Sequence, residues 1–179
     1  MRSEIALLIR ESKSKTYYKS FDGNLCGYGG FQYEVGKTYI TNTDDTFRWF
    51  HFCPKAKLAI RYSNSKDTRV CEIKRVGDKI SKYDDQRTSN GIEIIREIRE
   101  QELYEKLEEE KCPLLTILMK LRPSFEYLMK RKNEIHGMQM KAEIINRADL
   151  TTSQKKELLN KRWHKEIERN EKSRRLLGM

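Results

Sequence analysis

The sequence has little that would let the protein enter or cross a membrane. None of its hydrophobic runs approaches the roughly 20 residues that a helix needs to span a bilayer. The apolar run 5–9 is too short for a secretory signal peptide, and Arg10 and Glu11 follow it at once. We therefore expect no membrane contact, and we expect the protein to remain in the compartment where it is made.

Cysteine and histidine are also scarce. Four cysteines and three histidines are scattered along the chain, and no two cysteines form a CxxC pair. The closest pair of metal-ligand types is His51 and Cys53, which would share one face of a strand, with Cys26 and Cys71 at a distance. Because this spacing is not that of a zinc site, we expect no metal and mostly buried, reduced thiols.

Motifs for phosphate and base recognition are missing. The segment 27–30, Gly-Tyr-Gly-Gly, has neither the order of a dinucleotide fingerprint nor the following Lys-Ser or Lys-Thr of a P-loop. A tight turn explains it, and we expect no cofactor. The sequence also lacks a zinc finger, a helix-turn-helix, an RNP pattern and a KH loop, so we do not expect it to read base sequence.

What the sequence has in excess is positive charge. Lys and Arg number 37 against 27 Asp and Glu, a formal net charge of +10. This balance favours acidic partners, which are nucleic acid, an anionic membrane surface or an acidic patch on a protein. A charged surface that serves only solubility is the alternative.

The chain divides into two parts of different composition near Ile98. Seven of the nine glycines lie before this residue, together with short runs rich in Thr, Tyr and Phe. Pro54 is placed to begin a short helix that ends near Tyr62. The alternating or apolar runs predict about five or six strands, from the runs 5–9, 16–21, 31–35, 38–40 after the interruption at Gly36, 48–53, 70–76 and 91–95. We therefore predict an α+β fold, with a small mixed or antiparallel sheet module over 1–98 and an all-helical region over 99–179.

The second part has helical periodicity throughout. Leu103 and Leu107 predict a helix over 100–111, and Pro113 begins an apolar helix that Pro123 ends. The last helix has the clearest signal, because 151–154 has the spacing of a capping box, and it should run over about 152–176. Its apolar stripe is Leu159, Trp163 and Ile167. Its other side carries six cations, which are Lys155, Lys161, Arg162, Lys165, Arg169 and Lys172.

Six like charges on one face repel one another unless an anion neutralises them. The phosphates of a nucleic acid would do so with release of counterions, and an acidic groove on a protein would do so equally well. A face that is only solvated is the third interpretation. We take these six residues as candidate binding residues for nucleic acid or a protein partner.

The first part resembles an uncharacterised domain found in many bacteriophage genomes. The resemblance is carried by YKSFDGNLCGYGGFQYEVGKTY at 18–39, by WFHFC at 49–53 and by the proline-led helix that follows. It covers about 18–98 and departs from the family pattern at Ser20 and Trp49, where glycine is usual. It implies a phage origin and transfers no function.

A second resemblance is to the cofactor-binding strand of ADP-ribosyltransferases. An aromatic strand followed by a short helix ending in Tyr carries it. It implies that His51 and Tyr62 contact NAD and that Glu72 is the catalytic glutamate. The Arg or His expected in the first strand is absent from 16–21, where Lys19 is the only candidate.

These patterns favour a binding protein over an enzyme, because no convincing catalytic set is present. We interpret the chain as a phage-encoded accessory protein of the host cytoplasm or the virion. Its basic helix would contact nucleic acid or an acidic protein surface, either with the genome or as an inhibitor of a host defence or transcription complex. An NAD-dependent ADP-ribosyltransferase-like enzyme and a purely structural virion or scaffold protein are the alternatives.

Overall fold

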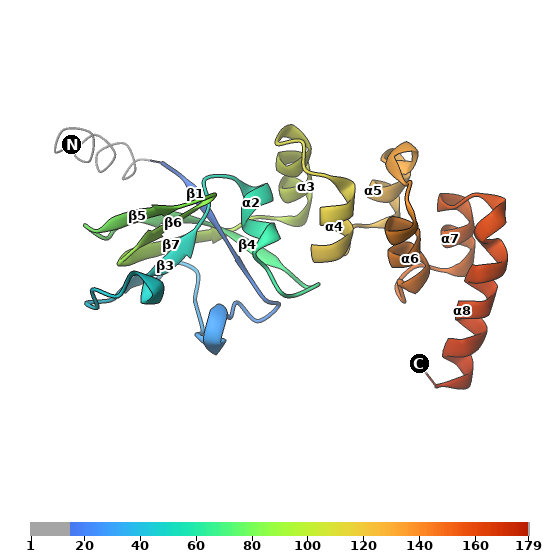
Figure 1. Ribbon diagram of the computed structural model, residues 1–179, viewed down its shortest axis with the longest axis horizontal. Coiled ribbons are helices and arrows are strands. Elements are labelled where there is room, and N and C mark those ends of the chain that lie inside the picture. Colours follow the sequence, from blue (N-terminus) through green and yellow to red (C-terminus); the bar gives the residue numbers. More distant parts are fainter. Residues whose placement is uncertain (1–14, 179) are drawn as a thin grey trace. The chain divides into compact units, whose positions relative to one another are not determined.

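The computed structural model describes residues 15–178, which divide into two compact units between Cys112 and Pro113 (Figure 1). The first unit contains seven strands and helices α2 and α3, and the second contains helices α4–α8. The predicted α+β class, with antiparallel sheets followed by helices, is confirmed. The strand expected at 5–9 lies outside the described residues.

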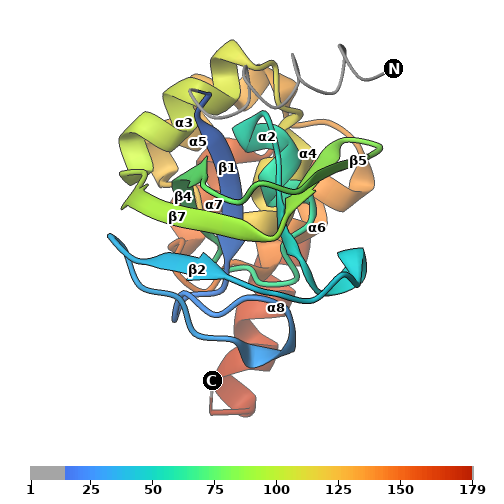
Figure 2. The same cartoon turned by 90° about the vertical axis from the view of Figure 1, so that its left-hand side faces the viewer.

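The first unit is built on two antiparallel sheets (Figure 2). The four-stranded sheet has the order β1-β4-β7-β2, and the three-stranded sheet has the order β3-β6-β5. The strands are β1 (Tyr17–Phe21), β2 (Thr38–Ile40), β3 (Phe50–Phe52), β4 (Arg69–Arg75), β5 (Ile80–Tyr83), β6 (Gln86–Ser89) and β7 (Gly91–Glu97). The sequence runs predicted every strand of the larger sheet, whereas β5 and β6 were missed.

One backbone bridge joins the two sheets, and a second close backbone contact extends the pairing of β4 with β7. Tyr18 and Cys53 exchange both backbone hydrogen bonds, at 2.8 and 2.7 Å, and so connect β1 to the end of β3. Gly77 and Gly91 meet where the chain leaves β4 and enters β7, and the amides of Val76 and Gly77 both donate to the Gly91 carbonyl. A Cβ atom on Gly77 would lie 2.4 Å from the Gly91 nitrogen, so this crossing requires glycine.

A buried cluster rich in aromatic residues lies on one face of the larger sheet. Alternate residues of a strand point to opposite faces, so Tyr17, Lys19 and Phe21 share this face. Tyr17 packs edge-on against Phe52 of β3, with ring centroids 4.8 Å apart. The buried cluster is Tyr17, Phe21, Tyr33, Phe52, Cys71, Ile73, Ile92 and Ile94.

Helices α2 (Ala56–Arg61) and α3 (Glu100–Glu109) belong to the same unit. The Ser20 hydroxyl donates to the Ala59 carbonyl at 2.8 Å and fixes α2 against β1. The Glu110 carboxylate accepts hydrogen bonds from the backbone amides of Ala56 and Lys57, at 3.1 and 2.7 Å, and so caps α2. These bonds attach α3 to the sheet unit, so the division lies after Cys112 and not near Ile98.

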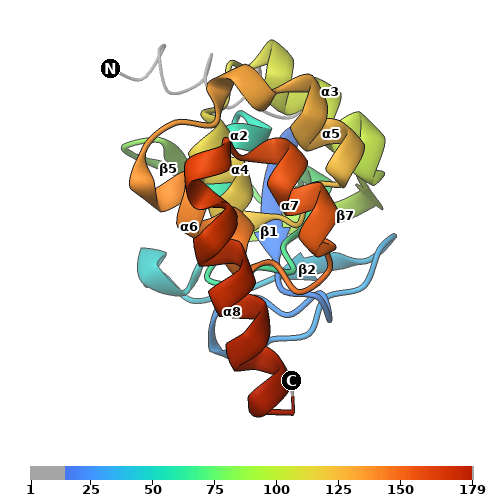
Figure 3. The same cartoon turned by 90° about the vertical axis from the view of Figure 1, so that its right-hand side faces the viewer.

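The second unit consists of short helices (Figure 3). Its core includes Leu114, Ile117, Leu128, Ile144 and Ile167, all buried. The helices are α4 (Leu114–Lys120), α5 (Phe125–Lys130), α6 (Met138–Asn146), α7 (Thr152–Leu158) and α8 (His164–Leu176), with 3-10 turns η3 (Lys132–Glu134) and η4 (Lys161–Trp163).

The capping box at the start of α7 is confirmed, but the single helix over 152–176 is wrong. Thr151 Oγ1 accepts from the Gln154 amide at 3.2 Å, and Gln154 Oε1 accepts from the Thr151 amide at 2.8 Å. The helix ends at Leu158, Leu159 is extended, and α8 begins at His164. In one continuous helix Leu158 would stand in the middle of the cationic side. The break buries both Leu158 and Leu159 instead.

Candidate functional site

An aromatic cleft of about 820 Å³ opens in the first unit. Ten of the 19 residues that line it are aromatic, although aromatic residues make up only 9% of the chain. They come from η1 (Tyr28–Gly30), β2, η2 (Thr46–Arg48), β3, the connecting loops and the end of α2. We call this hollow the aromatic cleft.

Tyr33 is at the centre of the rings. Its ring centroid lies 4.8 Å from that of Phe31 and 5.0 Å from those of Phe21 and Tyr39, in tilted or edge-on geometry. Burial, with a smaller effect of the neighbouring Tyr39, raises the pKa of Tyr33 to about 12. The hydroxyl therefore stays protonated at neutral pH, and the rings form a neutral, rigid wall.

The outer part of the cleft has aromatic side chains in water. Tyr28 is 99% exposed and Phe47 is 86% exposed. Exposed rings of this size lose the free energy that burial would give, about 25 cal/mol per Å² of apolar surface. A contiguous apolar surface that a fold leaves uncovered is typical of a ligand-binding site.

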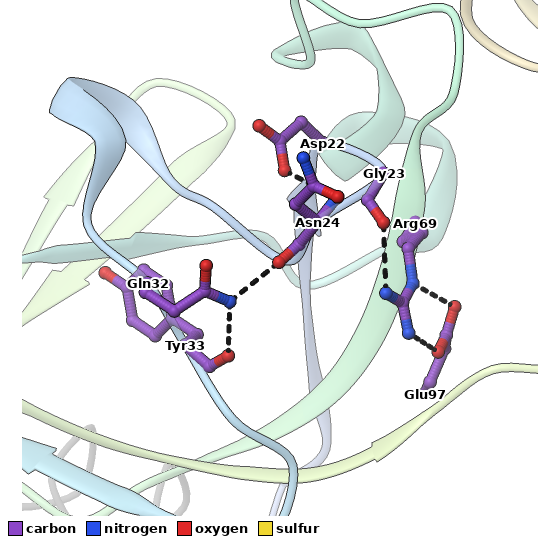
Figure 4. A network of polar contacts seen from close by, with 7 residues as sticks. All are labelled: Asp22, Gly23, Asn24, Gln32, Tyr33, Arg69 and Glu97. Carbon is purple, nitrogen blue, oxygen red and sulfur yellow. Dashed lines mark hydrogen bonds and ion pairs between the residues drawn. The ribbon is translucent and has the colours of Figure 1, made fainter.

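A polar network holds the loop that carries Phe31 and Tyr33 (Figure 4). Asp22 Oδ1 accepts from the amides of Asn24 and Cys26, at 2.9 and 2.8 Å. Gln32 Nε2 donates to the Asn24 carbonyl at 2.7 Å and to the Tyr33 carbonyl at 3.1 Å. These bonds close the loop on itself beside the cleft.

Arg69 fixes the same loop to the larger sheet. Its Nη1 donates to the Gly23 carbonyl at 3.1 Å, and its Nε donates to Glu97 Oε1 at 2.7 Å (Figure 4). Arg69 lies on β4 and Glu97 on β7, so two strands anchor one loop. The wall of the cleft is therefore preformed.

The side-chain amine of Lys19 lines the cleft. Its Nζ donates to the His51 carbonyl at 2.9 Å and lies 5.6 and 5.5 Å from the ring centroids of Phe21 and Tyr33. Within residues 15–178 no carboxylate forms an ion pair with it. Burial lowers the pKa of Lys19 from 10.5 to about 8. An ammonium with three donors and one recorded acceptor can accept an anionic group of a ligand.

His51 and Tyr62, which the transferase resemblance singled out, both line the aromatic cleft. His51 Nδ1 lies 3.2 Å from Gln86 Oε1, which orients the imidazole. Burial raises the pKa of Tyr62, so its hydroxyl is neutral at physiological pH. Burial also raises the pKa of Cys53 to about 12, so its thiol is protonated and does not serve as a nucleophile beside His51.

Glu72 does not join His51 and Tyr62. It lies opposite Tyr18 in the β1–β4 ladder, whereas Lys19 lies opposite Cys71. Glu72 is not among the residues that line the cleft. Arg96 Nε donates to Glu72 Oε2 at 2.9 Å and holds it there. The structure therefore does not bring Glu72 together with His51 and Tyr62, and its assignment as a catalytic glutamate stays a prediction.

Several residues of the cleft were missed from the sequence. The sequence placed Phe31 in a strand, but it lies in a loop, and Tyr28 and Phe47, which lie on 3-10 turns, were not considered as binding residues. The sequence signal for an exposed aromatic site was missed: these aromatic residues have Gly, Thr and Asp as neighbours in the sequence, in segments that do not form a strand and so do not bury them. Gln86 lies on β6, whose sequence has no strand pattern.

The six predicted cations do not form one face. Lys155 is 0% exposed and pairs with Glu171, with 2.5 Å between Nζ and Oε1, so its assignment as a binding residue is wrong. Arg169 pairs with Glu166 at 3.2 Å on the surface. The other four cations are Lys161, Arg162, Lys165 and Lys172. All four are exposed, and no described carboxylate pairs with them.

Comparison with known proteins finds one family. None of the helices over residues 15–178 is long and apolar enough to span a membrane, and no group of three His, Cys, Asp or Glu in this range could hold a metal ion. No curated protein and no solved structure matches the chain. The model of a domain of unknown function, DUF7666, matches residues 15–106, a range that contains every residue lining the aromatic cleft. Because this match covers just over half of the 179 residues, the chain belongs to the DUF7666 family.

Proposed function

We propose that the family domain binds a small ligand with a flat aromatic ring and an anionic group, of which a nucleotide is the simplest class. One observation carries the proposal: a cleft of about 820 Å³ whose wall is mostly aromatic also holds Lys19, an ammonium without a described carboxylate partner. This volume lies in the range of pockets that accept small molecules, about 300–1,000 Å³.

The exposed aromatic rings of the cleft favour a ligand with a planar ring. Tyr28 and Phe47 present exposed rings, and Phe31 is half exposed beside them. Stacking of a base on such a ring contributes about 1–3 kcal/mol. The ligand ring would cover apolar surface that the fold leaves in water.

The charges argue for an anion. Lys19 lies inside the cleft, and Arg48 lines the cleft with its side chain 78% exposed and only a 3.4 Å pair to Asp45. A phosphate near these groups would favour the charged form of Lys19, which burial disfavours.

The proposal is limited to binding. The resemblance to ADP-ribosyltransferases names NAD as one ligand of the proposed class, and the position of His51 and Tyr62 in the lining of the cleft supports this choice. Glu72 does not line the cleft and accepts a hydrogen bond from Arg96, so we propose no group transfer.

The test is calorimetric titration with adenosine, AMP, ADP, NAD and inorganic phosphate. We expect AMP, ADP or NAD to bind more tightly than adenosine or phosphate alone. Phe47→Ala should weaken nucleotide binding about 5- to 100-fold through lost stacking, without a change in folding, because Phe47 is exposed.

Lys19→Met separates the anion site from the ring site. It keeps the aliphatic stem and removes the charge, so it should weaken AMP binding at least about tenfold and leave adenosine binding unchanged. Lys74→Met, at an exposed position that does not line the cleft, is the matched control. No binding of any compound, or equal AMP affinity of Lys19→Met and wild type, would overturn the proposal.

For the biological setting, we propose a role in phage-infected cells, in the host cytoplasm or the virion. The likeness of residues 18–98 to a phage domain supports it. Affinity capture from infected cells should recover the protein with a phage or host complex, while its presence in purified virions in many copies would favour a structural or scaffold role.

A further inference from the structure

We propose that the exposed cations of η4 and α8 bind the phosphate backbone of a nucleic acid without reading its sequence. We call Lys161, Arg162, Lys165, Arg169 and Lys172 the η4–α8 face. This inference concerns the second unit and does not rest on the aromatic cleft.

Positive charge is concentrated in the helical unit. Residues 113–179 hold 16 Lys and Arg against 8 Asp and Glu, whereas residues 1–112 hold 21 against 19. Of the net charge of +10, the second unit therefore carries +8 in little more than a third of the chain. A general need for solubility would not separate the charge in this way.

Because the helix breaks between α7 and α8, one face of α8 carries only positive charges. Ile167 is fully buried and marks the inward side of α8. At about 100° per residue, Lys165, Arg169 and Lys172 fall within a sector of about 60° on the opposite side. All three are exposed, and Lys161 and Arg162 lie on η4 directly before α8.

The cations of α7, η4 and α8 fall into two groups, those that pair with a carboxylate of the unit and those that do not. Glu171 binds the buried Lys155, and Glu168 binds Lys156 at 2.6 Å. Glu166 reaches only Arg169. Lys161, Arg162, Lys165 and Lys172 have no described carboxylate partner and repel one another until an external anion neutralises them.

The composition of this face favours nucleic acid over protein. The buried centre of a protein–protein interface is apolar, with few charged residues. On α8 the exposed large apolar side chain is Leu176, at its end. A surface of cations without an apolar centre matches the phosphate backbone, whose binding is driven by counterion release.

Base reading is not supported at this face. Its aromatic residue, Trp163, is half-buried, with Lys141 Nζ 5.4 Å and the Arg162 guanidinium 5.6 Å from its ring centroid. A ring that two cations approach in this way is occupied and does not serve as a platform for a base. We therefore infer contact with phosphates alone.

The experiment is fluorescence anisotropy with a mixed-sequence duplex DNA and the whole protein at several salt concentrations. Wild type should bind with log K falling linearly in log salt, with a slope of about −4 for four to five phosphate contacts. Two unrelated DNA sequences should give the same affinity.

The deciding variant replaces Lys161, Arg162, Lys165 and Lys172 with Gln. Each removed phosphate contact reduces the slope by about 0.9, so the loss of four contacts should flatten the slope by about 3.6 units. The matched control replaces four other exposed lysines, Lys74, Lys82, Lys130 and Lys132, with Gln, which lowers the net charge equally and should change the slope by less than one unit. Circular dichroism melting shows that both variants are folded.

Three outcomes would overturn the inference. The first is an equal change of slope in the two quadruple variants, because only the total charge would then matter. The second is wild-type protein that does not bind DNA at low salt. The third is binding to polyglutamate without binding to DNA, which would identify an acidic protein as the partner.

Discussion

Lys155 and Glu171 form an ion pair between α7 and α8, with 2.5 Å between Nζ and Oε1 and with the lysine fully buried. Sixteen residues of one straight helix would separate them by roughly 24 Å. The pair forms only because the chain turns at Leu159 and Asn160. A cation that the sequence assigned to a binding surface is therefore a structural element of the helical unit.

Removal of the acid from this pair should destabilise the second unit. Glu171→Gln leaves the Lys155 ammonium buried without its carboxylate, at a cost of about 3 kcal/mol. Glu168→Gln is the matched control, since its pair with Lys156 is largely exposed and should contribute little to stability. Urea denaturation monitored by circular dichroism measures both. Equal effects of the two changes would show that Lys155 is not buried as described.

The same pair should make stability depend on pH. The hydrogen bond from Lys155 lowers the pKa of Glu171 below its ordinary value. On acidification the unfolded chain binds this proton first, so the stabilisation is present above the ordinary pKa and is lost as pH falls through the folded one. The difference in unfolding free energy between wild type and Glu171→Gln should therefore be largest near pH 7 and shrink below about pH 4. A difference that stays constant would contradict this.

The parts of the fold that local patterns determine were predictable from the sequence. Buried Ile73, Ile92 and Ile94 alternate with more exposed residues and mark β4 and β7. Thr151 and Gln154 are a local pair of side chains, and their capping box formed as predicted.

The parts that depend on distant contacts were not predictable. The hairpin of β5 and β6 has almost no apolar alternation, and it turns at Asp84, whose φ of +46° is a left-handed conformation. The end of α7 depends on burying Leu158 and Leu159 together. The aromatic cleft is formed by loops, turns and strands that lie between residues 18 and 86. No spacing of residues along the sequence indicates that these segments come together.

The crossing of Gly77 and Gly91 should not tolerate a side chain. In Gly77→Ala the new methyl would lie 2.2 Å from Asn90 Oδ1 and 2.4 Å from the Gly91 nitrogen, so strands would have to separate. We expect a loss of about 2–4 kcal/mol. Gly23→Ala is the control, because its nearest neighbour lies at an ordinary 3.5 Å. Thermal melting of both variants tests the expectation, and a Gly77→Ala protein as stable as Gly23→Ala would disprove it.

The four cysteines should differ in reactivity. None forms a disulfide, and Cys26 is half-buried whereas Cys53, Cys71 and Cys112 are buried. Burial also raises the pKa of Cys53 and of Cys71 to about 12, which suppresses their thiolates. Ellman's reagent should therefore modify one thiol quickly in the native protein and all four after denaturation. Cys26→Ser should remove the fast reaction, and a fast reaction that persists in this variant would assign it to another thiol.

Lys19 should make the first unit more stable as the solution becomes basic. Burial lowers its pKa to about 8 in the folded protein, while the unfolded chain keeps a value near 10.5. Below pH 8 the charged amine therefore destabilises the fold, and this effect disappears between about pH 8 and 10.5 because the folded state releases the proton first.

Comparison of wild type with Lys19→Met isolates this contribution, since other groups titrate equally in both proteins. The free energy of unfolding of wild type should rise relative to that of Lys19→Met between pH 7 and pH 10, and most of the change should fall above pH 8. Lys74→Met, at an exposed position, should show no such change. The neutral amine still donates to the His51 carbonyl at high pH, so loss of that hydrogen bond cannot produce the same trend. A relative stability that is flat from pH 7 to pH 10 would mean that Lys19 is solvated, and it would remove the desolvated ammonium on which the anion site of the cleft depends.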